Sequence, residues 1–216
     1  MHIVVHDHLT EIDAVQWNAM LAGNNPFMRH EFLSGLERCG CVCESTGWQP
    51  AHIAIYPDSN RTTLLGAMPC YIKNHSYGEY IFDWAWADAH HRHGLNYYPK
   101  LSNAVPFTPA SGERWLISGK ADRPAVFEAL INRALTLVRE LELSSFHSLF
   151  LGKDQFDALA DKDFSQRHST QFHWRNRGFQ CFEDFLGRMS SKKRKNIKRE
   201  RRRIRESGVS YRWLSG

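Results

Sequence analysis

The sequence of 216 residues lacks the short motifs that would assign a common chemistry directly. It contains no G-x-S-x-G elbow, no H-E-x-x-H pair and no Walker-type glycine loop. The sequence therefore gives no support to assignment as a serine hydrolase, a zincin or a P-loop NTPase. No stretch approaches the roughly 20 apolar residues of a membrane span, and the N-terminal apolar run is too short for a signal peptide. We therefore expect a soluble, cytoplasmic protein.

Paired cysteines are also missing. The five cysteines are an odd number, and three of them lie too close together, in Cys39-Gly-Cys-Val-Cys43, for an unstrained disulfide. This pattern indicates free thiols in a reducing cytosol. The alternatives are a zinc site that combines these cysteines with a distant histidine, or a metal site at His90-His91-x-His93. Because the cysteine spacing is not C-x2-C, we predict no metal site. We also predict no tightly bound cofactor.

Positive charge is concentrated in one segment. Between Lys192 and Arg205 there are ten basic residues and one acid, Glu200, whereas the whole chain has a net charge of only +5. The rest of the chain is therefore net acidic, and the pI near 9.0 reflects a single predicted helix. Three interpretations are open: a solvated charged face, a contact with phosphate groups of RNA or of a nucleotide-linked molecule, and sequence-reading DNA binding. Phosphate contact is favoured, because no DNA-reading motif is present.

Hydrophobic residues make up 42% of the chain, enough for a core, and their periodicity predicts a mixed order of strands and helices. The order favours an α/β fold of the α+β type, a mixed sheet flanked by helices. Strands are predicted at residues 2–6, 51–56, 62–73, 79–84, 114–118, 146–151, 170–175 and 209–214. Helices are predicted at residues 10–20, 27–36, 123–141, 154–160 and 182–189 and in the basic segment, with Ser190 or Ser191 as its N-cap.

The segment 75–100 is rich in aromatic and polar side chains, as pocket-forming loops often are. Glu79 or Asp83 could act as a general base, and His90 or His93 could shuttle protons near neutral pH. A strand ending at Trp86 would place Asp83 and Ala85 on one face and the two tryptophans on the other. A packed aromatic loop with surface histidines is the alternative for any single residue.

Several long motifs resemble those of a bacterial family. They are Asn25-Pro-Phe-Met-Arg-His-Glu-Phe-Leu, Thr46-Gly-Trp-Gln-Pro, Gly66-Ala-Met-Pro-Cys-Tyr-Ile-Lys, His75-Ser-Tyr-Gly-Glu-Tyr-Ile-Phe-Asp-Trp-Ala-Trp-Ala-Asp-Ala, Tyr97-Tyr-Pro-Lys-Leu, Ala104-Val-Pro-Phe-Thr-Pro, Phe172-His-Trp-Arg-Asn-Arg-Gly and the basic helix. On these residues the chain resembles the FemAB-like family of peptidoglycan biosynthesis or recognition, within the GNAT-like N-acyltransferase superfamily.

The resemblance implies two GNAT-like domains in tandem. We expect a first domain at residues 1–170 and, at 171–216, the start of a second, truncated domain, because members of the family are usually longer. The GNAT pyrophosphate loop, Q/R-x-x-G-x-G/A, occurs nowhere in the chain, and Arg175-Asn-Arg-Gly178 does not match it.

The resemblance also implies transfer of an acyl or aminoacyl group from acyl-CoA or aminoacyl-tRNA to an amine, with a peptidoglycan precursor as one candidate acceptor. The alternative is a non-catalytic module that recognises a cell-wall precursor or RNA through the basic helix. No oligomeric state is predicted. From residue clustering we predict an acceptor pocket with catalytic residues Glu79, Asp83, Tyr97, Tyr98 and Lys100. Predicted substrate-binding residues are Trp84, Trp86, Asp88, His90, Lys193, Arg194, Asn196 and Arg199, the last four holding the anionic carrier.

Overall fold

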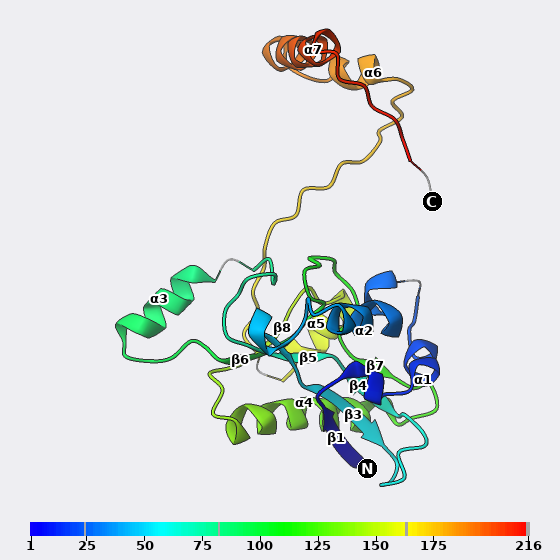
Figure 1. Cartoon of the computed structure of the whole chain (residues 1–216), viewed down its shortest axis with the longest axis vertical. Helices are drawn as coiled ribbons and strands as arrows, with labels where there is room; N and C mark the ends of the chain where they lie inside the picture. The colour runs from blue at the N-terminus through cyan, green and yellow to red at the C-terminus, as the bar shows by residue number, and fades with distance from the viewer. Residues whose placement is uncertain (24, 82, 163, 215–216) are drawn as a thin grey trace. The chain divides into compact units, whose positions relative to one another are not determined.

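The structure is a computed structural model that describes residues 1–23, 25–81, 83–162 and 164–214. It divides into two compact units, residues 1–166 and 167–216, which are described separately (Figure 1). No helix in the described part of the chain is long and apolar enough to cross a membrane.

The first unit contains two four-stranded sheets. The first is antiparallel and has the order β1-β3-β4-β7, formed by β1 (His2–His6), β3 (His52–Tyr56), β4 (Gly66–Met68) and β7 (Leu116–Ile117). The second has the order β2-β5-β6-β8, formed by β2 (Trp48–Pro50), β5 (Cys70–Lys73), β6 (Lys100–Asn103) and β8 (Phe146–Ser148). Only the β6–β8 pair is parallel. The sheets with their helices confirm the predicted mixed α/β class.

The long helix α4 (Arg123–Glu140) has the predicted start. The Asp122 carboxylate accepts a hydrogen bond from the Ala125 N–H, and Pro124 occupies the first turn, where its missing N–H costs nothing. Figure 1 shows α4 in green along the strands of the first sheet. Its apolar side packs against both sheets and forms the main core, which includes Ile53, Met68, Cys70, Leu101 and Leu130.

Shorter helices cover the other face of the first sheet. Trp17 and Leu33 are fully buried there, in a second core against Ala54, Tyr56 and Ala67. The remaining elements of this unit are η1 (Leu9–Glu11), α1 (Ala14–Ala19), η2 (Pro26–Met28), α2 (His30–Arg38), η3 (Glu44–Thr46), α3 (Trp84–Arg92) and α5 (Lys153–Ala160).

Two strand predictions in this unit are wrong. The run 62–73 is not one strand, because Pro69 has no N–H for a ladder and separates β4 from β5, which belong to different sheets. The described residues of the run 79–84 form no strand either, and Phe82 lies outside the described residues. A helix begins at Trp84, after Asp83, so Asp83 and Ala85 do not share a strand face.

In the second unit, the predicted helices form as α6 (Phe182–Gly187) and the basic α7 (Ser191–Glu206), with Ser190 as the N-cap of α7. The Arg201 guanidinium lies 4.1 Å from the centre of the Phe182 ring, so the two helices are in contact. The predicted strands 170–175 and 209–214 do not form, and neither segment has a pairing strand among the described residues of this unit. The assignment of this unit as the start of a second GNAT-like domain stays a prediction.

Candidate functional site

The alternation of side chains along β5 and β6 divides the second sheet into an apolar face and a polar face. Cys70 and Leu101 point into the core under α4. Lys73 and Lys100 are register partners on these antiparallel strands, and their side chains belong to the opposite face. Both lysines are fully buried. A buried lysine needs an anionic partner, or else it tends to lose its proton. Among the described residues, Lys100 has anionic partners and Lys73 has none within ion-pair distance.

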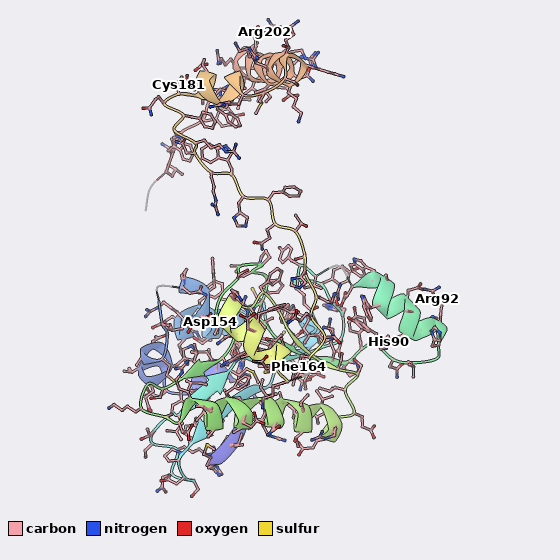
Figure 2. The ribbon with its side chains drawn as sticks, turned by 180° about the vertical axis from the view of Figure 1, so that it is seen from behind. His90, Arg92, Asp154, Phe164, Cys181 and Arg202 are labelled. Carbon is pink, nitrogen blue, oxygen red and sulfur yellow. The ribbon has the colours of Figure 1, made fainter. Side chains whose placement is uncertain are left out.

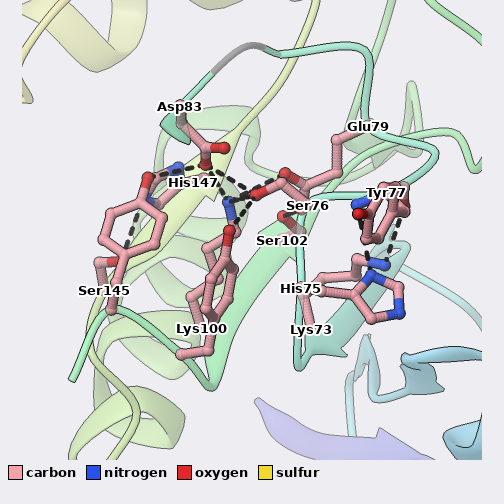
Figure 3. Close-up of polar contacts among 12 residues, drawn as sticks. Lys73, His75, Ser76, Tyr77, Glu79, Asp83, Lys100, Ser102, Ser145 and His147 are labelled. Atoms are coloured by element: carbon pink, nitrogen blue, oxygen red, sulfur yellow. Dashed lines mark hydrogen bonds and ion pairs between the residues drawn. The ribbon is translucent and has the colours of Figure 1, made fainter. Parts of the chain in front are cut away.

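Lys100 is compensated by two carboxylates (Figure 3). Its Nζ lies 2.9 Å from Glu79 Oε2 and 2.8 Å from Asp83 Oδ2, and all three side chains are fully buried. Nζ also donates to Ser76 Oγ at 3.0 Å. The second oxygen of Glu79 accepts a 2.7 Å hydrogen bond from Ser102 Oγ. The polar face therefore carries a network of hydrogen bonds and ion pairs centred on the Lys100 ammonium group.

The two carboxylate oxygens of Asp83 differ in their hydrogen bonds. Its Oδ2 accepts hydrogen bonds of 2.8 Å from Lys100, Ser76 Oγ and the Tyr97 hydroxyl. Burial alone would raise the pKa of Asp83, but these hydrogen bonds, led by the one from Lys100, hold the pKa below its usual value. Its Oδ1 is buried and has no hydrogen-bond partner among the described residues. Asp83 is therefore an ionised carboxylate with one oxygen available to a cationic group.

Lys73 lacks a carboxylate within ion-pair distance in the described part of the chain. Its Nζ lies 3.5 Å from the centre of the Trp48 ring and donates to the Tyr77 carbonyl at 3.3 Å. The pKa of Lys73 is lowered to about 7. Burial is the largest cause, the charge of Glu79 opposes it, and the charge of Lys100 adds to the lowering. Close to neutral pH, Lys73 is therefore partly uncharged.

The family comparison identifies the chain. The model of the family described as FemAB-like, peptidoglycan biosynthesis/recognition, matches residues 8–216. The chain belongs to this family. No curated protein matches the sequence. Among solved structures, the FemAB-like chain is similar to the apo aminoglycoside 6'-N-acetyltransferase of Acinetobacter haemolyticus, with 13% identity and a TM-score of 0.45. The likeness covers 82% of this chain and 99% of that chain, but the identity and TM-score are too low to carry the neighbour's activity over.

The structure of the FemAB-like chain brings all five predicted catalytic residues together. Glu79, Asp83, Tyr97 and Lys100 are linked as described above, and the Tyr98 hydroxyl lies 2.8 Å from Ser76 Oγ. Their predicted roles in catalysis stay predictions. Sequence reasoning missed Ser76, Ser102 and Lys73. For Lys73, the one available signal was a lysine at the end of an otherwise apolar strand, Cys70–Lys73.

The predicted substrate-binding residues belong to two helices, α3 of the first unit and α7 of the second. On α3, Trp84, Trp86 and Asp88 are exposed, and Asp88 forms a 3.0 Å ion pair with Arg92. His90, labelled in Figure 2, packs its ring against Tyr97 with centroids 5.1 Å apart. The four predicted carrier contacts, Lys193, Arg194, Asn196 and Arg199, are on α7 in the second unit. Their roles also stay predictions.

Among the described residues, no group of three His, Cys, Asp or Glu side chains is placed to bind a metal ion. All five cysteines are free thiols, as the sequence indicates.

Replacing Lys73 with methionine tests whether this amine is uncharged. At pH 6 both the folded and the unfolded wild type carry the Lys73 proton, so the folded state bears the full cost of a buried charge. Between pH 7 and the ordinary value of 10.5, only the unfolded chain keeps the proton, so wild-type stability rises with pH. We expect Lys73→Met to be the more stable protein at pH 6. Its advantage should shrink by about 1.4 kcal/mol per pH unit above pH 7.

Urea unfolding of both proteins at pH 6, 7, 8 and 9 measures this difference. Lys120→Met, at an exposed turn, is the control and should give a difference that does not change with pH. A pH-independent difference for Lys73→Met as well would show that Lys73 is charged throughout this range.

Proposed function

We propose that this protein is an N-acyltransferase that transfers an acyl or aminoacyl group to an amine, with a peptidoglycan precursor as the acceptor. The family match over residues 8–216 carries the proposal. The buried network supports this proposal, because its Asp83 carboxylate can bind a cationic amine. Asp83 Oδ1 is ionised, buried and unpartnered, and an acceptor ammonium is the kind of ligand that would satisfy it.

The residues have distinct roles in this proposal. Asp83 binds the acceptor ammonium and orients its nitrogen, while Lys100 and Tyr97 keep the carboxylate charged and fixed. Because the pKa of Asp83 is low, this carboxylate binds the ammonium better than it removes its proton. The bound ammonium first gives one proton to water, and the free amine then attacks the donor carbonyl carbon. The C–N bond forms, the bond from that carbon to the carrier breaks with its electron pair going to the carrier atom, and this atom takes up the second proton that the nitrogen loses.

Access to Asp83 depends on the start of α3. Asp83 is the N-cap residue of this helix, and α3 buries none of its side chains fully. Segments with few buried contacts open at little cost in free energy. We infer that the acceptor reaches Oδ1 when the first turn of α3 moves aside.

The donor is acyl-CoA or aminoacyl-tRNA, held by basic side chains of α7. Nine of the ten basic residues between Lys192 and Arg205 have no ion pair among the described residues; Arg202, paired with Glu206 at 3.9 Å, is the exception. The missing pyrophosphate loop supports the second candidate function, a module that binds a precursor or RNA without turnover.

Ligand-induced stabilisation of the purified chain distinguishes these functions. The ligands are acetyl-CoA, UDP-linked muramyl pentapeptide and bulk tRNA, each at low and high salt. A preformed site adds about 2.7 kcal/mol of stability when the ligand is at about 100 times its Kd. We expect the pentapeptide to stabilise the protein at both salt concentrations, because a buried carboxylate is little screened.

The donor is then identified by mass spectrometry of the pentapeptide after incubation with each carrier. A mass increase equal to one acyl group confirms transfer. Stabilisation by tRNA alone, lost at high salt and without transfer, would support the binding module and contradict the enzyme.

A further inference from the structure

A pocket of about 490 Å³ lies beside the buried network and takes no part in the proposed chemistry. Four of the seven residues that line it carry aromatic rings, Trp48, His75, Tyr77 and Phe107, and the others are Leu36, Cys41 and Thr46. Trp48 and Phe107 have ring centroids 5.5 Å apart, and His75 and Tyr77 are 5.2 Å apart. The aromatic surface continues onto α3, because the ring centroids of Tyr77 and Trp84 are 5.5 Å apart.

The rings are fixed in place by their surroundings. Trp48 is fully buried and is held by the Lys73 amine on its face and by Tyr71, 5.3 Å away. Gly78 has φ +80°, and a Cβ there would lie 2.7 Å from the Phe107 ring. Gly47 has φ +71°, and a Cβ would lie 2.3 Å from His75. Two left-handed glycines thus allow two of the rings to approach the backbone closely.

Phe107 itself adopts φ +58°, a conformation that is unfavourable for a bulky residue. Its side chain is nevertheless 41% exposed, so its burial returns little to offset the strain. Tyr77 is 66% exposed. Strained residues that gain little from burial are often found at ligand sites. Two exposed rings at one pocket, above a buried Trp48, indicate a binding function rather than a core.

The pocket wall restricts the ligand class. Among the described residues that line the pocket there is no lysine, arginine, aspartate or glutamate, and the Lys73 amine is fully buried against the Trp48 ring and the Tyr77 carbonyl. A phosphate or another strongly charged group would therefore have no counterion there. Flat rings with polar edges suit a ligand that is uncharged, ring-shaped and rich in both C–H and hydroxyl groups. The C–H groups of such a ring pack on the negative face of an aromatic ring, and its hydroxyls reach the Tyr and His edges.

We propose that this aromatic pocket binds an N-acetylated amino-sugar ring of the peptidoglycan glycan. The inference rests on the proposed function for its choice of sugar, and it separates recognition of the glycan, at the pocket, from recognition of the amine, at Asp83. One precursor would occupy both places, with its sugar against the exposed rings of Tyr77 and Phe107 and its peptide extending toward the buried network.

Titration of the full chain with the uncharged disaccharide of two linked N-acetylglucosamine rings tests the inference, and the NMR signals of the protein report binding. The free stem peptide and adenosine serve as competing probes. We expect the disaccharide to bind and Tyr77→Ala and Phe107→Ala each to weaken it about tenfold. Tyr80→Ala is the matched control, since Tyr80 is an exposed tyrosine of the same loop outside the pocket wall and should leave binding unchanged.

Phe107→Tyr keeps a ring at this position and should retain binding, which separates loss of the ring from loss of the fold. The inference is overturned if the disaccharide fails to bind at about 10 mM, or if both alanine variants bind it as the wild type does. Binding of only the stem peptide or adenosine at this wall overturns it as well. If the disaccharide binds through the wall but no acyl transfer occurs, the proposed enzyme fails and the sugar site stands.

Discussion

Replacing Lys100 with methionine is expected to lower the free energy of unfolding by about 3–5 kcal/mol at pH 7. The substitution keeps most of the side-chain volume but removes the ammonium that lies within 2.9 Å of Glu79 and Asp83. Both carboxylates are fully buried, so neither can turn to water when its partner is lost. Urea unfolding of the variant and the wild type at pH 7 measures the change.

The control for this prediction is an exposed lysine with an equally short ion pair. Lys162 Nζ lies 2.6 Å from Glu128 Oε2, and both side chains are more than two-fifths exposed. Lys162→Met should cost less than about 1 kcal/mol, because water screens the pair. Similar costs for both variants would contradict the view that burial makes the Lys100 network important.

Acidic pH should reduce the loss in the free energy of unfolding that Lys100→Met causes. In the wild type the pKa of Asp83 is lowered, so its contribution to stability is present near neutral pH and is lost as the pH falls through the folded pKa. In the variant the effect of burial on Asp83 is no longer opposed by the ammonium. Its carboxylate should then take up a proton more readily than in the unfolded chain, so acid favours the folded variant.

Replacing Asp83 with asparagine is expected to lower kcat/KM for acyl transfer at least 100-fold. Asparagine is similar in size to aspartate and can still accept hydrogen bonds from Lys100 and Ser76, but it carries no charge for an acceptor ammonium. The loss should appear mainly as a raised KM if Asp83 holds the ammonium equally in the ground and transition states, and as a lowered kcat if it orients the nitrogen for attack. Transfer to UDP-linked muramyl pentapeptide, followed by mass spectrometry, is the assay.

Asp157→Asn is the matched control for the charge change. Asp157 is exposed and its one ion pair among the described residues is with Lys153 of the same helix, so this variant should keep wild-type activity. Circular dichroism of Asp83→Asn shows whether the fold is retained. A folded Asp83→Asn protein with full activity would remove Asp83 from the proposed acceptor site.

Local signals were sufficient for several parts of the structure. The apolar periodicity and the Asp122-Arg123-Pro124 start predicted α4, and the charge run with Ser190 as its cap predicted α7. The acids, tyrosines and lysine crowded into residues 75–100 predicted which side chains gather, since a short polar and aromatic stretch can bury its charges most easily against one another.

Other features depended on contacts that no local pattern contains. Asp83-Trp-Ala-Trp86 alternates like a strand, yet no strand among the described residues pairs with it, and helix α3 begins at Trp84 instead. Pro69 places β4 and β5 in different sheets.

The sequence by itself determined the composition of the site: one lysine, two acids and two tyrosines within a single stretch. Only the tertiary structure decided how charge is shared there. The register of β5 against β6 places Lys73 opposite Lys100, and the loop that follows β5 brings both acids to Lys100. Lys73 is left with an aromatic ring and one carbonyl, because two carboxylates cannot saturate one buried ammonium and also reach the other.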